Sequence, residues 1–390
     1  HERAVGHSLR STRYPKGVFM TPKRPRSAVA IPKAVEPTAG KKAKSGPLYA
    51  ALDLGTNSCR MLIAQPDGAQ FKVVDSFSKA VQLGMGLEGT GRLSRSSMNR
   101  TLQALRICAQ KLKQYRIKKM RLVATEACRR AENGDALIRQ VRNETGLKLE
   151  IIKAEEEAQL AVVSCAPLVA PDTDQLLVVD IGGGSTELVW IDLIDVAPET
   201  RSRAIMHMHN GFRSGEKPNR YGAKVIDWIS VPLGVATLRD QFNDVDDDAG
   251  RFALMSLMFE EKLEQFIPYE RDYKKDHFQI IGTSGTVTTV AASYLGLKRY
   301  DRNKVDGLSM SSIEIEAIIH DYLRMGPAGR QQDPRIGRDR QALIMSGAAI
   351  LQALLRSWPT HKLSVADRGL REGLLYAQMS ADGVLRERKI

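Results

Sequence analysis

Cysteine is scarce in this 390-residue sequence, and long hydrophobic runs are absent. The four cysteines, Cys59, Cys108, Cys128 and Cys165, form no Cys-x-x-Cys pair. This disfavours both a disulfide framework and a zinc site and is typical of free thiols in a reducing compartment. No segment offers the roughly 20 consecutive apolar residues that span a bilayer. We therefore expect a cytoplasmic protein with no membrane partner.

Acidic residues are nearly missing from the beginning of the chain. Residues 1–46 contain 2 Asp/Glu beside 11 Lys/Arg, together with five prolines and almost no apolar periodicity. This composition predicts a disordered basic arm. The arm could bind a polyanion, or it could be an inert solvated extension or a vector or start-site artefact. It has no apolar h-region, so we do not expect it to be a signal peptide.

The most informative stretch is VVDIGGGSTELVW, at residues 178–190. The apolar run 176–179 predicts a buried strand, and residues 182–184 predict a tight reversal. Residues 187–190 then predict the returning strand of a hairpin. The tip of this hairpin is bare glycine backbone.

Such a tip can bind an anion. Without a Cβ in the way, the amides of residues 183–186 can close on a phosphate, and Asp180 and Glu187 flank it. Carboxylates in this position can hold the Mg2+ that accompanies phosphate. An ordinary glycine hairpin gives the same local pattern, so further elements are needed.

A second copy of this layout lies earlier in the chain, at residues 48–65. There an apolar strand ends in Asp53, a turn of small and hydroxyl residues follows, and a second apolar strand leaves it. ALDLGTNS in this copy corresponds to VVDIGGGS in the other. The repeat indicates an internal duplication in which each copy opens one domain.

Strands and helices alternate between the two copies. An amphipathic helix is predicted over 96–116, a strand over 120–127, a helix over 136–145 stopped by Gly146, and a helix over 155–166. This alternation predicts an α/β domain with a mostly parallel sheet. The 43% hydrophobic content is enough to fill the cores of two domains.

Charged residues that could belong to a site lie at two of these elements. Arg129 and Arg130 come just after a strand, where loops of α/β domains face the ligand. Glu155, Glu156 and Glu157 occupy the first turn of a helix, where they can simply stabilise its dipole. The functional alternative is a general base that deprotonates water beside a phosphate.

A third anion-facing element is predicted at 278–296. A strand runs into Gly282, Thr283, Ser284 and Gly285, and a helix begins directly afterwards. A tight strand-to-helix connection without a ligand would have the same pattern.

Six motifs stand in an order that resembles the Ppx/GppA family of exopolyphosphatases and guanosine pentaphosphate phosphohydrolases, within the actin-like superfamily. They are DLGTNS at 53–58, ATEACRRAEN at 124–133, EEA at 156–158, DIGGGSTE at 180–187, GTSGT at 282–286 and GLREGLL at 369–375. The resemblance covers about residues 48–380 and is to the short, two-domain form.

The resemblance implies two duplicated ribonuclease-H-like (actin-like) α/β domains with a central cleft between them. We expect the basic arm at 1–46, domain I at 47–172 and domain II at 173–390. We leave open whether the last helix returns to domain I.

The resemblance also assigns roles to residues. Glu157 would be the general base, Arg129 would neutralise phosphoryl oxygens, and Mg2+ or Mn2+ would bind the acids Asp53, Asp180 and Glu187. The remaining positions would bind phosphate through amides and hydroxyls: Gly55, Thr56, Asn57, Ser58, Gly182, Gly183, Gly184, Ser185, Thr186, Gly282, Thr283, Ser284 and Gly285. Gln82 and Met85 depart from the family, which often has an arginine and an acid in this stretch.

The function expected from this resemblance is hydrolysis of the terminal phosphoanhydride of inorganic polyphosphate, an exopolyphosphatase activity. Guanosine pentaphosphate is the alternative substrate, and a non-catalytic polyphosphate or nucleotide sensor or an actin-like kinase are alternatives of other classes. The chemistry needs a clamp on dispersed charge, a metal and an aligned water. We expect a homodimer, as the family often forms, and no specific nucleic-acid partner.

Overall fold

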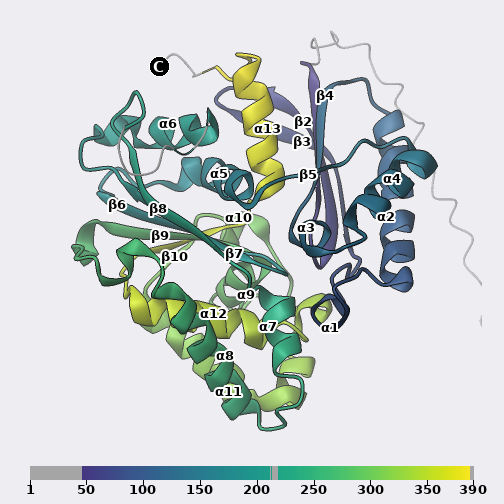
Figure 1. The fold of residues 1–390 in the computed structure, drawn as a ribbon. Helices are drawn as coiled ribbons and strands as arrows, with labels where there is room; N and C mark the ends of the chain where they lie inside the picture. Colours follow the sequence, from purple (N-terminus) through teal and green to yellow (C-terminus); the bar gives the residue numbers. More distant parts are fainter. Residues whose placement is uncertain (1–45, 211, 213–217, 387–390) are drawn as a thin grey trace, which may run out of the picture. The chain divides into compact units, whose positions relative to one another are not determined.

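The computed structural model describes residues 46–210, 212 and 218–386. The basic arm predicted at 1–46 therefore lies almost entirely outside the described residues. Two sheets and the helices packed on them make up the described chain (Figure 1). None of the helices in this part of the chain is long and apolar enough to cross a membrane.

The first sheet has the strand order β3-β2-β1-β4-β5. Its strands are β1 Leu48–Leu54, β2 Ser58–Asp67, β3 Gln70–Ala80, β4 Ile117–Ala124 and β5 Glu150–Ile151. β1 is central and apolar, and it pairs antiparallel with β2 and parallel with β4. The prediction of a mostly parallel sheet was wrong, because β2 and β3 fold back antiparallel on one side of β1 and make the sheet mixed.

The second sheet repeats this arrangement in the order β8-β7-β6-β9-β11-β10. Its strands are β6 Gln175–Ile181, β7 Thr186–Asp192, β8 Lys224–Val231, β9 Phe278–Thr283, β10 Ser309–Met310 and β11 Leu363–Ala366. The strands β8, β7 and β6 pair antiparallel, and β6, β9 and β11 pair parallel. The first five strands thus have the order and directions of the first sheet, which is the duplication that the repeated hairpin indicated.

Helices cover the first sheet on both faces. α2 (Arg95–Lys113) and α4 (Gly134–Thr145) share a hydrophobic core with one face. Ser94 caps α2 by accepting a hydrogen bond from the amide of Ser97 at 3.2 Å. The apolar side chains of α2 recur with helical spacing. α13 (Leu370–Ala381) packs on the other face, against β1 and β2. The short helices here are α1 (Leu87–Thr90) and α3 (Glu126–Arg130).

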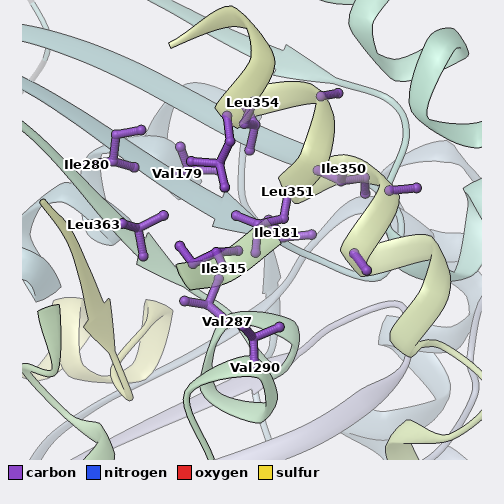
Figure 2. Close-up of a cluster of buried hydrophobic side chains, with 14 of the residues drawn as sticks. Val179, Ile181, Ile280, Val287, Val290, Ile315, Ile350, Leu351, Leu354 and Leu363 are labelled. Carbon is purple, nitrogen blue, oxygen red and sulfur yellow. The ribbon is translucent and has the colours of Figure 1, made fainter. Parts of the chain in front are cut away.

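The second sheet carries the larger core. α8 (Asp248–Leu263), α9 (Gly285–Tyr294), α11 (Ser312–Gln332) and α12 (Ile344–Ser357) pack on one face. Figure 2 shows Val179 and Ile181 of the central strand meeting Leu351 and Leu354 of α12 in this core. α5 (Ala154–Cys165) and α6 (Arg201–Met206) lie on the opposite face, and α5 also packs on α13. The remaining α-helices are α7 (Val235–Gln241) and α10 (Arg302–Val305).

Candidate active site

A cavity opens where the β1–β2 turn faces the β6–β7 turn. Most of the predicted site residues line it: Asp53, Gly55, Thr56, Asn57, Ser58, Glu157, Asp180, Gly182, Gly183, Gly184, Ser185, Thr283, Ser284 and Gly285. The wall therefore combines both duplicated turns, the first helical turn region of α5 and the junction between β9 and α9. Polar and glycine residues from four separate stretches converge on one space.

Four predicted residues do not reach the wall of this cavity. Gly282 is inside β9, and Thr186 is fully buried in β7 with its hydroxyl donating to the carbonyl of Leu233 at 2.8 Å. Glu187 lies behind the wall on β7, and Arg129 lies behind Glu157.

The glycine turn of the second hairpin is held with the amides of Gly183 and Gly184 free, while the amide of Gly182 donates to the carbonyl of Ser185 at 2.9 Å. The carbonyls of Gly182 and Gly183 accept amide hydrogen bonds of 2.9 Å from Val235 and Ala236 at the beginning of α7. In contrast, the amides of Gly183 and Gly184 donate to no acceptor in the described chain. Free amides on a glycine turn that lines a cavity form a site for a phosphate oxygen.

The two duplicated turns touch each other across the cavity. A Cβ on Gly184 would lie 2.6 Å from Thr56 Oγ1, and one on Gly183 would lie 3.2 Å from the amide nitrogen of Asn57. Only glycine permits this approach of the two backbones. The turns therefore enclose a common anion site.

The third anion-facing element is the N-terminus of α9. Ser284 caps this helix by accepting the amide of Val287 at 3.1 Å, and Ser284, Gly285 and Thr286 face the cavity. The positive end of the helix dipole adds to the amides of the two turns.

Glu157 is the carboxylate at the centre of the site. Its Oε2 accepts hydrogen bonds of 3.1 Å from both Nη1 and Nη2 of Arg129, while no described group donates to its Oε1. Burial and then the negative charge of Glu187 raise the pKa of Glu157 well above its usual range, against the opposing charge of Arg129. A carboxylate with a raised pKa and one free oxygen is suited to accept a proton.

Two further acids, Asp180 and Glu187, belong to the same group of acids as Glu157. Asp180 and Glu187 are cross-strand partners on β6 and β7, so their side chains share one face of the sheet. Burial, with smaller contributions from Glu157 and Asp53, raises the pKa of Asp180 to about 8. Burial and then Asp180 likewise raise the pKa of Glu187, whose Oε1 accepts 2.7 Å hydrogen bonds from Ser185 and Ser230.

The acids fit Mg2+ in part. Asp53 and Asp180 line the cavity, and Glu187 Oε2 is buried without a hydrogen-bond partner among the described residues. No group of three or more Asp, Glu, His or Cys side chains within the described ranges is arranged to hold one metal ion. Mg2+ commonly takes one or two carboxylates and completes its shell with water and substrate phosphate. The pair Asp53 and Asp180 fits such a site, with Glu187 beside Asp180.

Four arginines that the motif assignment left out also line the cavity: Arg60 on β2, Arg340 just before α12, Arg368 just before α13 and Arg371 on α13. Of these, Arg368 is neutralised by Asp306, with Nη2 2.7 Å from Oδ2. Among the described residues, the guanidinium groups of Arg60 and Arg340 form no hydrogen bond or ion pair, and that of Arg371 has only Glu372 at 3.8 Å. Burial lowers the pKa of Arg60, and the positive charge of Arg371 lowers it further. Burial likewise lowers the pKa of Arg340, and the positive charge of Arg60 adds to this effect. Partly buried cations that repel one another favour an anionic ligand between them.

Arg60 had a signal in the sequence. It lies opposite Asp53 in the first hairpin, in the register that places Glu187 opposite Asp180 in the second. Arg371 belongs to the quoted GLREGLL motif. Arg340 belongs to no motif, and only the packing of the chain before α12 against α9 brings it to the site.

Two actin-like domains with glycine and hydroxyl turns around buried acids define a phosphate-handling protein of the actin-like class. The family model described as "Ppx/GppA phosphatase family" matches residues 62–382, and the chain belongs to this family. The match begins after the first turn, so Asp53 and its neighbours rest on the geometry described above.

Relatives and solved structures agree with this family. The chain is 27% identical over 333 residues to the guanosine-5'-triphosphate,3'-diphosphate pyrophosphatase of Aeromonas salmonicida, covering 85% of this chain and 59% of that protein. The chain thus spans less than two thirds of the length of this curated relative.

Solved structures resemble nearly all of the chain. The Ppx/GppA family member of Aquifex aeolicus is 26% identical with a TM-score of 0.67, covering 86% of this chain and 98% of that chain. An exopolyphosphatase-like protein is 26% identical with a TM-score of 0.72 and the same coverage. An exopolyphosphatase from Cytophaga hutchinsonii, 22% identical with a TM-score of 0.69, covers 86% of this chain and 98% of its own and supports the fold alone.

Proposed function

We propose that this protein hydrolyses the terminal phosphoanhydride bond of inorganic polyphosphate and releases orthophosphate, with Glu157 as general base. The observation that carries the proposal is the position of Glu157 in a cavity lined by the two glycine and hydroxyl turns and the N-terminus of α9. One oxygen is held by Arg129 and the other is free. A buried carboxylate with a raised pKa beside an anion site can deprotonate an attacking water.

The binding groups match a chain of phosphates. Free amides of the glycine turn and the N-terminus of α9 can hold one phosphoryl group, and Arg60, Arg340 and Arg371 can neutralise its neighbours. Bound Mg2+ would lie on Asp53 and Asp180, where it would neutralise charge that develops on the phosphoryl oxygens. Phosphoryl transfer needs positioning and charge stabilisation more than covalent help from the protein.

The hydrolysis step forms one bond to phosphorus, breaks another and transfers one proton to Glu157. A water oxygen attacks the terminal phosphorus while Glu157 Oε1 accepts the proton of that water. The bond to the bridging oxygen breaks, and the electron pair leaves with the shortened polyphosphate. The leaving chain carries added negative charge, which Arg60, Arg340 and Arg371 in the wall stabilise.

The second candidate is removal of the 5'-phosphate from guanosine pentaphosphate. A neighbouring groove shares Thr56, Asn57 and Leu343 with the site. Its further lining includes Gln82, Met85 and the ion pair between Arg239 and Asp240, in which Nη2 lies 2.6 Å from Oδ1. The lining also contains one further cation, Arg338, and one further acid, Asp339, so its charges balance. A groove without net charge suits a nucleoside better than a longer phosphate chain. The name of the Aeromonas salmonicida relative supports the same candidate.

The test is orthophosphate release by the purified protein with Mg2+ from long polyphosphate, short polyphosphate and guanosine pentaphosphate. Glu157→Gln keeps the shape of the side chain and removes the base, so it should abolish release while substrate still binds. Faster release from polyphosphate supports the first candidate, and preference for the nucleotide supports the second. Tight binding without release from any of them would indicate the sensor, and phosphate transfer from ATP to an acceptor would indicate the kinase.

Two further expectations belong to this proposal. A homodimer and a cytoplasmic location stay predictions, to be checked by light scattering of the full chain and by its distribution between cell fractions. Replacing Mg2+ with Mn2+ should preserve activity because both ions accept carboxylate, water and phosphate oxygens.

A further inference from the structure

Glu126 is a cavity residue to which no motif assigned a role. It is the first residue of α3, it is 9% exposed, and it lines the same cavity as Glu157. Its Oε2 accepts hydrogen bonds from Arg129 Nε at 3.1 Å and from Arg129 Nη2 at 2.5 Å. Its Cγ lies against the glycine turn, only 3.0 Å from where a Cβ on Gly184 would be.

An ordinary structural role does not account for Glu126. An acid in the first turn can stabilise a helix through its dipole, and an i,i+3 ion pair is common on helix surfaces. However, no backbone amide of α3 donates to this carboxylate. The ion pair is also not on the surface, because the side chains of Arg129 and Glu126 are only 20% and 11% exposed.

Every N–H donor of the Arg129 guanidinium has an acceptor within the protein. An arginine offers five N–H groups in a fixed fork. Nε and one hydrogen of Nη2 bind Glu126, while one hydrogen of each Nη binds Glu157 Oε2. The last hydrogen of Nη1 binds the carbonyl of Ile152 at 2.8 Å. All five donors are thus used within the protein, and two of them are used by Glu126.

We infer that Glu126 is a positioning residue that locks the Arg129 guanidinium against Glu157 and thereby orients the general base. The inference rests on the proposed function, because it gives Glu126 its purpose through Glu157. It also makes Arg129 a holder of the base in this geometry, instead of a direct ligand of the phosphoryl oxygens.

Loss of the hydrogen bonds between Glu126 and Arg129 should lower the rate of hydrolysis. Without Glu126, two donors of Arg129 lose their acceptor and the guanidinium can rotate away from Glu157. Misplacement of a catalytic group by about 1 Å can cost about 100-fold in rate. We expect Glu126→Ala to lower kcat by roughly 10- to 100-fold with KM changed less than about twofold, since the anion-binding turns and arginines remain.

Two variants separate positioning from folding. Glu126→Gln keeps an oxygen that can accept from Arg129 and should retain more of kcat than Glu126→Ala. Glu132→Ala is the matched control in the same segment, because among the described residues the Glu132 side chain forms only an exposed ion pair, with Arg92 at 2.8 Å. It should leave kcat and KM unchanged. A kcat of Glu126→Ala equal to that of the unchanged protein would overturn the inference.

A fall in KM at constant kcat would also overturn it. That result would mean that Glu126 competes with the substrate for Arg129, and that its removal frees donors for a phosphoryl group.

A second readout needs no turnover. In protein with 15N-labelled arginine, locked guanidinium N–H groups of Arg129, assigned with Arg129→Lys, should give separate slowly exchanging signals. These signals should vanish in Glu126→Ala and persist in Glu132→Ala. If the unchanged protein releases no phosphate from any substrate, the proposed function fails, whereas the NMR result still decides the lock. Persistence of the Arg129 signals in Glu126→Ala refutes the lock.

Discussion

The guanidinium of Arg340 lies directly on the backbone of Gly285 at the beginning of α9. A Cβ built on Gly285 would be 1.2 Å from Arg340 Nη1 and 1.9 Å from its Cζ. Arg340 therefore reaches the cavity only because residue 285 has no side chain. The contact joins the N-terminus of α9 to a cation from a segment that is 55 residues further along the chain.

Gly285→Ala should weaken substrate binding by displacing Arg340. A hydrogen bond to a charged group contributes roughly 1.5–3 kcal/mol, so we expect KM to rise by about 10-fold or more. Arg340→Gln should have a similar effect, and the double variant should be no worse than either single variant. Steady-state kinetics on polyphosphate would measure this, with Gly89→Ala as control because nothing lies within 4 Å of a Cβ there. Additive losses would show that Gly285 acts independently of Arg340.

Asp180 should make the stability of the metal-free protein depend on pH. Burial raises its pKa to about 8 in the folded state, while an unfolded aspartate titrates near 3.9. Between these values the folded chain binds more protons than the unfolded chain, so stability falls as pH rises from about 4 to about 8. The largest slope from one group is about 1.4 kcal/mol per pH unit.

Thermal unfolding in EDTA from pH 5 to pH 8 would measure this dependence. We expect the Tm of Asp180→Asn to depend less on pH than that of the unchanged protein and to exceed it by the most, several °C, at pH 8, since 1 kcal/mol corresponds to roughly 2–4 °C. Asp67→Asn, at an exposed hairpin end, is the control and should keep the original slope. Equal slopes for all three proteins would exclude Asp180 as the source.

Much of the fold followed from local signals in the sequence. The two hairpins are continuous apolar runs broken by glycine and hydroxyl residues, and α2 and α4 have helical periodicity with a serine or glycine at their ends. β3 escaped prediction because its pattern is polar and half exposed, with Asp75 interrupting the alternation of Phe71, Val73 and Phe77. Its strand character comes from pairing with β2.

The residues of the candidate site also fall into a predictable group and an unpredictable group. Residues on the turns could be predicted because a turn places its own neighbours. The bonds of Arg129 to Glu157, across 28 residues, and the position of Arg340 on Gly285 depend on how separate elements pack. Such contacts have no local sequence signature, so the roles of Glu126 and Arg340 emerged only from the structure.

Contact between the two glycine turns should matter for the rate. Gly184→Ala would place a Cβ 2.6 Å from Thr56 Oγ1 and 3.0 Å from Glu126 Cγ, so the two turns must separate. We expect kcat to fall by about 100-fold, because the free amides move relative to Glu157. Combining Gly184→Ala with Thr56→Ser, which keeps the hydroxyl, should not restore activity, whereas Thr56→Ala should restore part of it. Full activity of Gly184→Ala would mean that the turns need not touch.

The basic arm at 1–46 should take no part in the chemical step. Its 11 Lys/Arg against 2 Asp/Glu create a positive field that can attract a polyanion and that salt screens. Deleting residues 1–46 should leave kcat at saturating polyphosphate unchanged. If the arm captures polyphosphate, deletion raises KM at low salt and removes most of the salt dependence of kcat/KM. If the arm is an inert extension, KM and its salt dependence stay as they were. A large fall in kcat would instead place the arm in the active cavity and contradict the prediction.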